Sequence, residues 1–162
     1  MKPSSPTELT SPVLFLADHA AVESGKLYVN GGCWNRLTFP DFPASVTFSV
    51  VAVILVPWRD TSSHEFTVRF EDPDGSPLGA VLSGELTAGT PDDAHAGDPT
   101  LVPITAVIDH FTVERPGDYT VVLEVDGERK NDWSFRVLHL VEDDGHGGAF
   151  PDPSDPTNLP FG

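Results

Sequence analysis

Residues 119–140 read YTVVLEVDGERKNDWSFRVLHL and contain two runs in which every second residue is apolar. These apolar positions are Val121, Leu123, Val125, Trp133, Phe135 and Val137. Because successive side chains of a β-strand point to opposite faces, each run is typical of a strand with one buried face. The polar segment DGERKND separates the runs, so the stretch predicts an antiparallel hairpin hinged near that segment.

Similar strand patterns recur along the chain at short spacing, separated by turn residues such as the PDGSP of residues 73–77. The further expected strands are 13–17, 26–31, 45–56, 64–72, 78–86 and 101–113. A single helical turn at residues 20–25, capped by Asp18, is the one helix signal. Seven to nine strands with this punctuation predict an all-β fold, an antiparallel β-sandwich.

The segment RPGDY, which ends at Tyr119, sharpens this prediction. A strand ending at Phe111, a Pro-Gly turn and a tyrosine opening the next strand resemble the tyrosine corner of immunoglobulin-like sandwiches. In that corner the tyrosine hydroxyl bonds to backbone a few residues upstream. The chain has one cysteine, so the disulfide of antibody domains is excluded and the likeness concerns architecture alone.

Composition divides the chain into three parts. Residues 1–12 hold three prolines and several hydroxyl side chains, and we expect a flexible arm. Residues 142–162 hold five acids, four prolines and no Lys or Arg, and we expect disorder. The predicted sandwich domain is therefore 13–141, with an acidic surface loop at 87–100.

The charge balance excludes several classes of function. Twenty-five acids against nine bases give a formal net charge of -16. Such a surface repels phosphate backbones and anionic membranes, so we expect neither nucleic acid nor a membrane as a partner. The longest apolar run, 50–56, is too short to cross a bilayer. The unpaired Cys33 favours a reducing compartment, and we expect a cytoplasmic protein.

The stretch ADHAAVESGKLYVNGGCW, residues 17–34, raises the question of a catalytic site. Cys33 has no predicted helix terminus or paired base to activate it, so we expect a small buried apolar side chain and no catalytic residue. Gly31 and Gly32 precede no helix, which disfavours phosphate binding. The six histidines lack the close spacings of zinc motifs, so no metal or cofactor is expected, although histidines from different strands could still converge.

A structural interpretation of the same stretch needs fewer assumptions. We expect strand, turn and strand, with a glycine bend that brings Trp34 over the core. Asp18 and His19 then hold the corner together by local hydrogen bonds. As binding residues the candidates are Asp18, His19, Trp34 and Trp58.

ADHA, a short spacer, GKLYVNGG and Trp34 resemble the N-terminal signature of a family of small uncharacterised bacterial, largely actinobacterial, proteins. The Val56-Pro57-Trp58 strand end and the PG-x-Y turn extend the resemblance over about residues 14–138. It implies a β-sandwich fold and a bacterial cytosolic origin, and it implies no activity. At position 33 the resemblance implies a small residue or glycine in place of cysteine.

Three functions are compatible with these observations. A non-enzymatic protein-interaction module, which binds a protein partner or a second copy of the chain, is favoured because sandwiches commonly present a sheet face or loops. A hydrolytic or metal-dependent enzyme would use Asp18 and His19. A small-ligand binder would use Trp34 and Trp58. A flat apolar patch would favour the interaction module, and a pocket with convergent polar groups would favour the enzyme.

Overall fold

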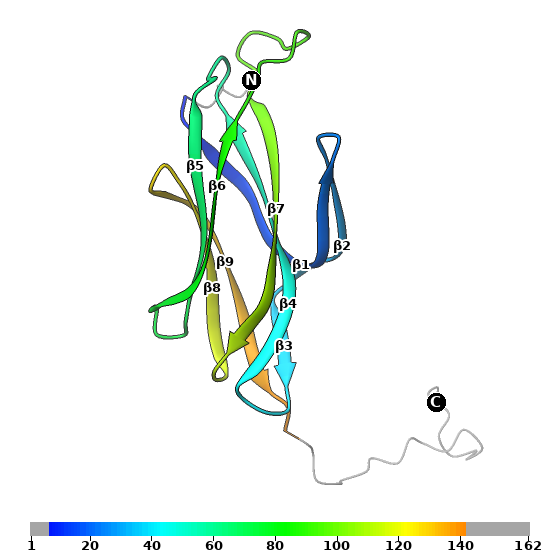
Figure 1. Cartoon of the computed structure of the whole chain (residues 1–162), viewed down its shortest axis with the longest axis vertical. Coiled ribbons are helices and arrows are strands. Elements are labelled where there is room, and N and C mark those ends of the chain that lie inside the picture. The colour runs from blue at the N-terminus through cyan, green and yellow to red at the C-terminus, as the bar shows by residue number, and fades with distance from the viewer. Residues whose placement is uncertain (1–6, 142–162) are drawn as a thin grey trace, which may run out of the picture.

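The structure, a computed structural model, describes residues 7–141. Nine strands of these residues form two sheets (Figure 1). The four-stranded sheet has the order β2-β1-β4-β7 and the five-stranded sheet the order β3-β9-β8-β5-β6. The strands are β1 (Thr10–Glu23), β2 (Lys26–Trp34), β3 (Arg36–Phe39), β4 (Ala44–Val56), β5 (Ser63–Glu71), β6 (Pro77–Thr87), β7 (Thr100–Val113), β8 (Gly117–Val125) and β9 (Glu128–His139).

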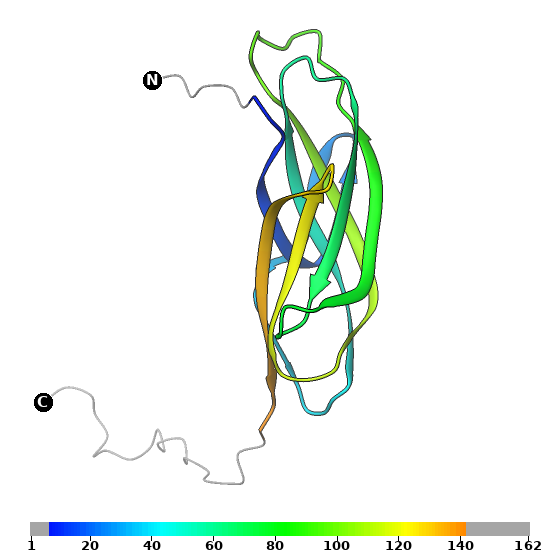
Figure 2. The same ribbon diagram turned by 90° about the vertical axis from the view of Figure 1, so that its left-hand side faces the viewer.

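The predicted all-β sandwich is confirmed. Figure 2 looks onto the five-stranded sheet, in which β9, β8, β5 and β6 follow one another from left to right. The strand pairs are antiparallel, except that β3 runs parallel to β9. The sequence analysis did not predict this short strand at the sheet's edge.

Aromatic side chains from both sheets fill the space between them. Phe48 and Phe111 of the four-stranded sheet meet Phe70 and Phe135 of the five-stranded sheet. The ring centroids of Phe70 and Phe111 lie 4.8 Å apart, and those of Phe48 and Phe135 lie 6.3 Å apart. All four rings are buried. The pairs are mostly tilted or edge-on, the arrangements that aromatic rings prefer.

Tyr119 makes the hydrogen bond that its position predicts. Its hydroxyl donates to the carbonyl oxygen of Arg115 at 2.9 Å, and its ring stacks on Phe135 with centroids 5.7 Å apart. The side chain is 2% exposed. This bond ties the turn before β8 to the core. The immunoglobulin-like assignment as a whole stays a prediction.

Strand β1 corrects two details of the sequence analysis. Residues 10–12, expected in a flexible arm, begin β1, where the side chain of Ser11 donates to the carbonyl oxygen of Val53. Residues 20–25 form no helical turn, because Ala20–Glu23 pair with Lys26–Val29 of β2. Ser24 and Gly25, both with positive φ, make the two-residue turn between the strands. Cross-strand pairing has overridden a weak local helix preference.

The hairpin of β8 and β9 is tighter than the sequence suggested. It turns at Asp126 and Gly127, with φ values of 52° and 78°, and the following residues 128–132 already belong to β9. Polar side chains in this run do not end the strand, because three of the five are exposed and Asn131 Nδ2 donates to the carbonyl oxygen of Ser11 at 2.7 Å. The predicted tail, 142–162, and the first six residues of the arm lie outside the described residues.

Candidate interaction surface

The two sheets differ sharply in charge. Residues 10–17 of β1, 44–56 of β4 and 100–108 of β7 contain no charged side chain, in a chain that is 21% charged. The five-stranded sheet carries ion pairs instead. Arg69 Nε lies 2.8 Å from Glu124 Oε1, and Arg136 Nε lies 2.6 Å from Asp118 Oδ1. The five-stranded sheet therefore has a charged outer face, whereas these three runs of the four-stranded sheet carry no charge.

Register places apolar residues on the outer face of the four-stranded sheet. Val51 pairs with Thr105, Val53 with Pro103 and Leu55 with Leu101, and these residues alternate with core positions such as Ala52 and Ile54. Phe15 of β1 pairs with Val51 from the other side. Both faces of β4 are thus apolar, which is unusual for a strand with one solvated side.

The hairpin of β1 and β2 covers part of this outer face. In Figure 1 the second half of β1 turns back upward beside β2, at the right of the molecule. A second small cluster joins the hairpin to the sheet: Ala17, Ala20 and Val51 are at most 4% exposed, and Phe15 and Leu27 pack against them. The backbone N–H of Ala20 also donates to Ser49 Oγ at 3.2 Å.

The remainder of this surface leaves large apolar side chains in solvent. Leu101 is 66% exposed and Val107 61% exposed on β7, and Tyr28 is 53% exposed on β2. Val29 and Val22 of the hairpin are exposed as well. Val22 and Val29 share the side of the hairpin that packs on the sheet, because they pair with Leu27 and Ala20 of that side, whereas Tyr28 points to the opposite side. We call Leu101, Val107, Val22 and Val29 the apolar surface. The sequence signal for it was the absence of charge in the three strand runs.

The bend near the end of β2 depends on glycine. Gly31 has a φ of 60°, and a β-carbon there would collide with the side chain of Asp18. A β-carbon on Gly32 would come within 2.7 Å of Val29 Cγ1 and 3.1 Å of Phe15. The predicted glycine bend is therefore present. Beyond it, Trp34 packs edge-on against Phe48 and Phe135, with centroid distances of 5.6 and 6.1 Å.

Asp18 and His19 do not form a joint site. Both are exposed neighbours in β1, where consecutive side chains point to opposite faces. Within residues 7–141 neither side chain makes a hydrogen bond or ion pair. Asp18 does not cap a helix, since no helix follows it, and its side chain lies over Gly31 instead.

Trp34 and Trp58 lie apart from that pair and from each other. Trp34 joins the core, whereas Trp58 lies in the turn after β4 under the guanidinium of Arg59, which is 4.0 Å from the indole centroid. The indole Nε1 atoms of both tryptophans are buried without a hydrogen-bond partner among the described residues. The four candidate residues thus occupy three places.

Cys33 is exposed, which corrects the expectation of a buried side chain. Its φ of 64° is a conformation that favours glycine. The glycine bend turns the side chain outward, so neighbouring sequence was a poor guide to its burial. Glycine, one of the residues that the family resemblance implies at this position, would suit this backbone better because it has no β-carbon.

The most perturbed histidine is one that sequence reasoning did not single out. His64 is 7% exposed, with Nδ1 2.8 Å from Asp126 Oδ2 and Nε2 3.3 Å from Asp60 Oδ2. The hydrogen bond with Asp126 raises the pKa of His64, and Asp60 adds to this while burial opposes it. The same bond lowers the pKa of Asp126. This cluster joins the β4–β5 loop to the β8–β9 turn.

Other kinds of site find little support within residues 7–141. No three His, Cys, Asp or Glu side chains there are grouped so that they could hold a metal ion. The same residues include no helix that is long and apolar enough to span a membrane. The larger hollows, of about 300 to 450 Å³, are open depressions in the surface.

Two solved structures are similar in part. The alkylpurine DNA glycosylase AlkC of Pseudomonas fluorescens, solved bound to DNA containing an abasic site analog, is 13% identical with a TM-score of 0.40. The match covers 77% of this chain and 30% of the glycosylase. A β-glucosidase from Listeria innocua, in complex with isofagomine, is 14% identical with a TM-score of 0.42, over 82% of this chain and 16% of the enzyme. At such TM-scores neither likeness says what this chain does.

The comparison with protein families is more specific. No curated protein matches the sequence significantly. A family model described as a family of unknown function, DUF6941, matches residues 12–138. That range spans all nine strands except the first two residues of β1 and the last of β9. The chain therefore belongs to this family of unknown function, DUF6941.

Proposed function

We propose that the protein is a non-enzymatic protein-interaction module whose apolar surface binds a protein partner. The observation that supports this most is that Leu101 and Val107, which are 66% and 61% exposed, lie in a run of β7 without charge, residues 100–108, while Val22 and Val29 of the same sheet are exposed as well. Large exposed apolar patches with polar borders mark interaction sites on soluble proteins.

Charge argues for a partner that differs from the chain itself. Two copies, each with a net charge of -16, would repel each other at low ionic strength. A neutral or basic partner avoids this cost. We therefore favour binding of another protein over self-association. We propose a reducing cytoplasm as the compartment, because the exposed and unpaired Cys33 stays a thiol there.

The two alternatives have weaker support. An enzyme built on Asp18 and His19 needs side chains that converge, whereas these point to opposite faces of β1. A ligand site built on Trp34 and Trp58 needs accessible indoles close together. Trp34 is packed against Phe48, and Trp58 is covered by Arg59.

The experiment compares two leucine-to-aspartate variants in partner capture from the native host. Leu101→Asp places a charge on the apolar surface, while Leu138→Asp places the same charge at an exposed position on β9 of the other sheet. Captured proteins are quantified by mass spectrometry, and light scattering records the oligomeric state of each variant. We expect Leu101→Asp to lose a partner that Leu138→Asp and the unchanged chain retain.

Other results would contradict the proposal. If both variants capture the same proteins as the unchanged chain, the apolar surface is not the binding site. If Asp18→Ala or His19→Ala, in a chain that melts normally, abolishes a catalytic activity or metal content, the enzyme alternative is correct. Melting curves of all variants separate lost binding from lost folding.

A further inference from the structure

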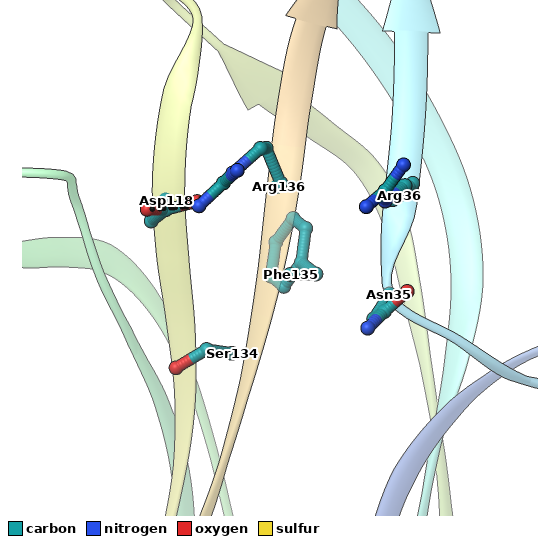
Figure 3. A pocket seen from close by; sticks show the side chains of 6 residues that line it. All are labelled: Asn35, Arg36, Asp118, Ser134, Phe135 and Arg136. Carbon is teal, nitrogen blue, oxygen red and sulfur yellow. Dashed lines mark hydrogen bonds and ion pairs between the residues drawn. The ribbon is translucent and has the colours of Figure 1, made fainter.

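A hollow of about 340 Å³ lies on the five-stranded sheet, away from the apolar surface. Figure 3 shows its lining residues on β3, β8 and β9 and on the segment just before β3. They are Asn35, Arg36, Asp118, Ser134, Phe135 and Arg136. The hollow therefore combines two arginines with amide and hydroxyl groups, in a chain where acids greatly outnumber bases.

The parallel pairing of β3 and β9 brings the two arginines together. Arg36 is in direct register with Arg136, and the backbone N–H of Arg136 donates to the carbonyl oxygen of Asn35 at 2.8 Å. Residues in register on neighbouring strands project from the same face of a sheet. Two guanidinium groups are thus neighbours, an arrangement that repels unless anions compensate it.

One of the two arginines is already neutralised within the protein. Arg136 Nε and Nη2 donate to the two carboxylate oxygens of Asp118, at 2.6 and 3.1 Å. In Figure 3 the Arg136 side chain points toward Asp118 on β8 and away from Arg36. The bond from Arg136 lowers the pKa of Asp118, so this carboxylate is ionised at neutral pH.

Arg36 has no such counter-charge among the described residues. Ion pairs in residues 7–141 engage Arg69, Arg115, Arg129, Lys130 and Arg136, and Arg59 lies over Trp58. Arg36 is exposed and forms none of these contacts. Its planar guanidinium presents a fork of donors that fits a carboxylate.

The backbone beside Arg36 is open as well. Strand β3 spans four residues and is the last strand on its side of the five-stranded sheet. Its second edge has no paired strand among the described residues. An extended peptide can add to such an edge through backbone hydrogen bonds, while pockets beside the edge select its side chains.

We propose that this hollow binds a carboxylate side chain of another protein, carried by an extended peptide segment that pairs with the free edge of β3. Arg36 holds the carboxylate by a forked pair of hydrogen bonds, and the exposed side chains of Asn35 and Ser134 offer further donors. A single carboxylate fits better than a phosphate dianion, because Asp118 adds a negative charge to the same hollow. The site lies on a different sheet from the apolar surface and does not depend on the proposed function.

The test is an NMR titration of the full chain with a capped peptide of sequence TEVEVT, in parallel with its glutamine counterpart TQVQVT. Salt is kept near 50 mM, at which screening still leaves charge pairs measurable. We expect shifts of the Arg36 Nε–H and of the amides in residues 35–39, with the glutamate peptide binding at least about tenfold more tightly.

Two variants locate the binding site. Arg36→Gln should weaken glutamate-peptide binding by at least about tenfold, the loss expected for a charge-assisted hydrogen-bonded pair. Lys26→Gln removes the same charge from the exposed turn of the β1–β2 hairpin and should leave binding unchanged. Equal binding of the two peptides, shifts elsewhere on the protein, or no effect of Arg36→Gln in a chain that melts normally would overturn the proposal.

The competing source of a carboxylate is this chain itself. Residues 142–162 follow β9 and contain five acids without Lys or Arg. A full-length variant with all five acids changed to their amides separates these sources. If the tail supplies the carboxylate, the Arg36 Nε–H resonance moves in this variant before any peptide is added, and the peptide then binds more tightly; this result would overturn the assignment to another protein. If a partner supplies it, the resonance and the peptide affinity stay as in the unchanged chain.

Discussion

Replacing Tyr119 by phenylalanine removes one hydroxyl and leaves the packing of the ring in place. The lost bond is the 2.9 Å donation to the carbonyl oxygen of Arg115. A net hydrogen bond contributes about 1 kcal/mol to folding, and a partly buried carbonyl left without its donor adds to the loss. We expect Tyr119→Phe to lower the free energy of unfolding by about 1–2 kcal/mol, or the melting temperature by roughly 2–6 °C.

The assay is urea denaturation followed by circular dichroism, and the chain supplies a matched control. Tyr28→Phe deletes the same hydroxyl from a side chain that is 53% exposed and makes no hydrogen bond within residues 7–141. Its free energy of unfolding should change by less than about 0.5 kcal/mol. If both variants unfold at the same urea concentration, the hydroxyl of Tyr119 does not secure the turn before β8, and the argument fails.

Three further perturbations test other parts of the structure. Because the pKa of His64 is raised, the protonated His64 contributes its full stabilisation below about pH 6.5, and this stabilisation is lost as the pH rises through the raised pKa. Urea midpoints measured across neutral pH should show this decline. The variant His64→Gln should not show it. Cys33→Gly should raise the free energy of unfolding by about 0.5–1 kcal/mol, since φ there is 64°; a lower melting temperature would contradict this. Gly31→Ala should lower the free energy of unfolding by about 1 kcal/mol or more, because φ at residue 31 is positive and the added β-carbon would collide with Asp18. An unchanged melting curve would show that the bend is not constrained.

The sequence could predict the strands because their signal is local. Alternation in residues 64–72 and 119–137 reports one buried face without knowledge of any partner strand. The hydroxyl of Tyr119 was predictable for the same reason, since donor and acceptor lie four residues apart. The apolar outer face was also visible in principle, because residues 44–56 lack the polar alternation of a strand with one solvated side.

Contacts between functional side chains were less predictable, because residues far apart in the sequence meet only when their strands pair. Asp18 and His19 are adjacent in sequence, which suggested a pair, yet adjacency in a strand separates side chains onto opposite faces. His64 and Asp126 lie 62 residues apart and form a 2.8 Å contact that no local pattern announces. The adjacency of Asp18 and His19 therefore suggested a site that the structure does not form. The separation of His64 from Asp126 in the sequence hid a contact that the structure does form.

The hollow lined by Arg36 and Arg136 could not be predicted from the sequence, even if every strand had been assigned correctly. Strand β3 has four residues, Arg36–Phe39, too few for a period to emerge from alternation. It pairs in parallel with β9, the last strand of the described residues, and only that register sets Arg36 beside Arg136. An antiparallel pairing, or a shift of one residue, would move Arg36 away from this neighbour or turn it to the other face. The charge of the hollow is thus a property of topology, and substitutions that preserve composition but alter the register of β3 should abolish it.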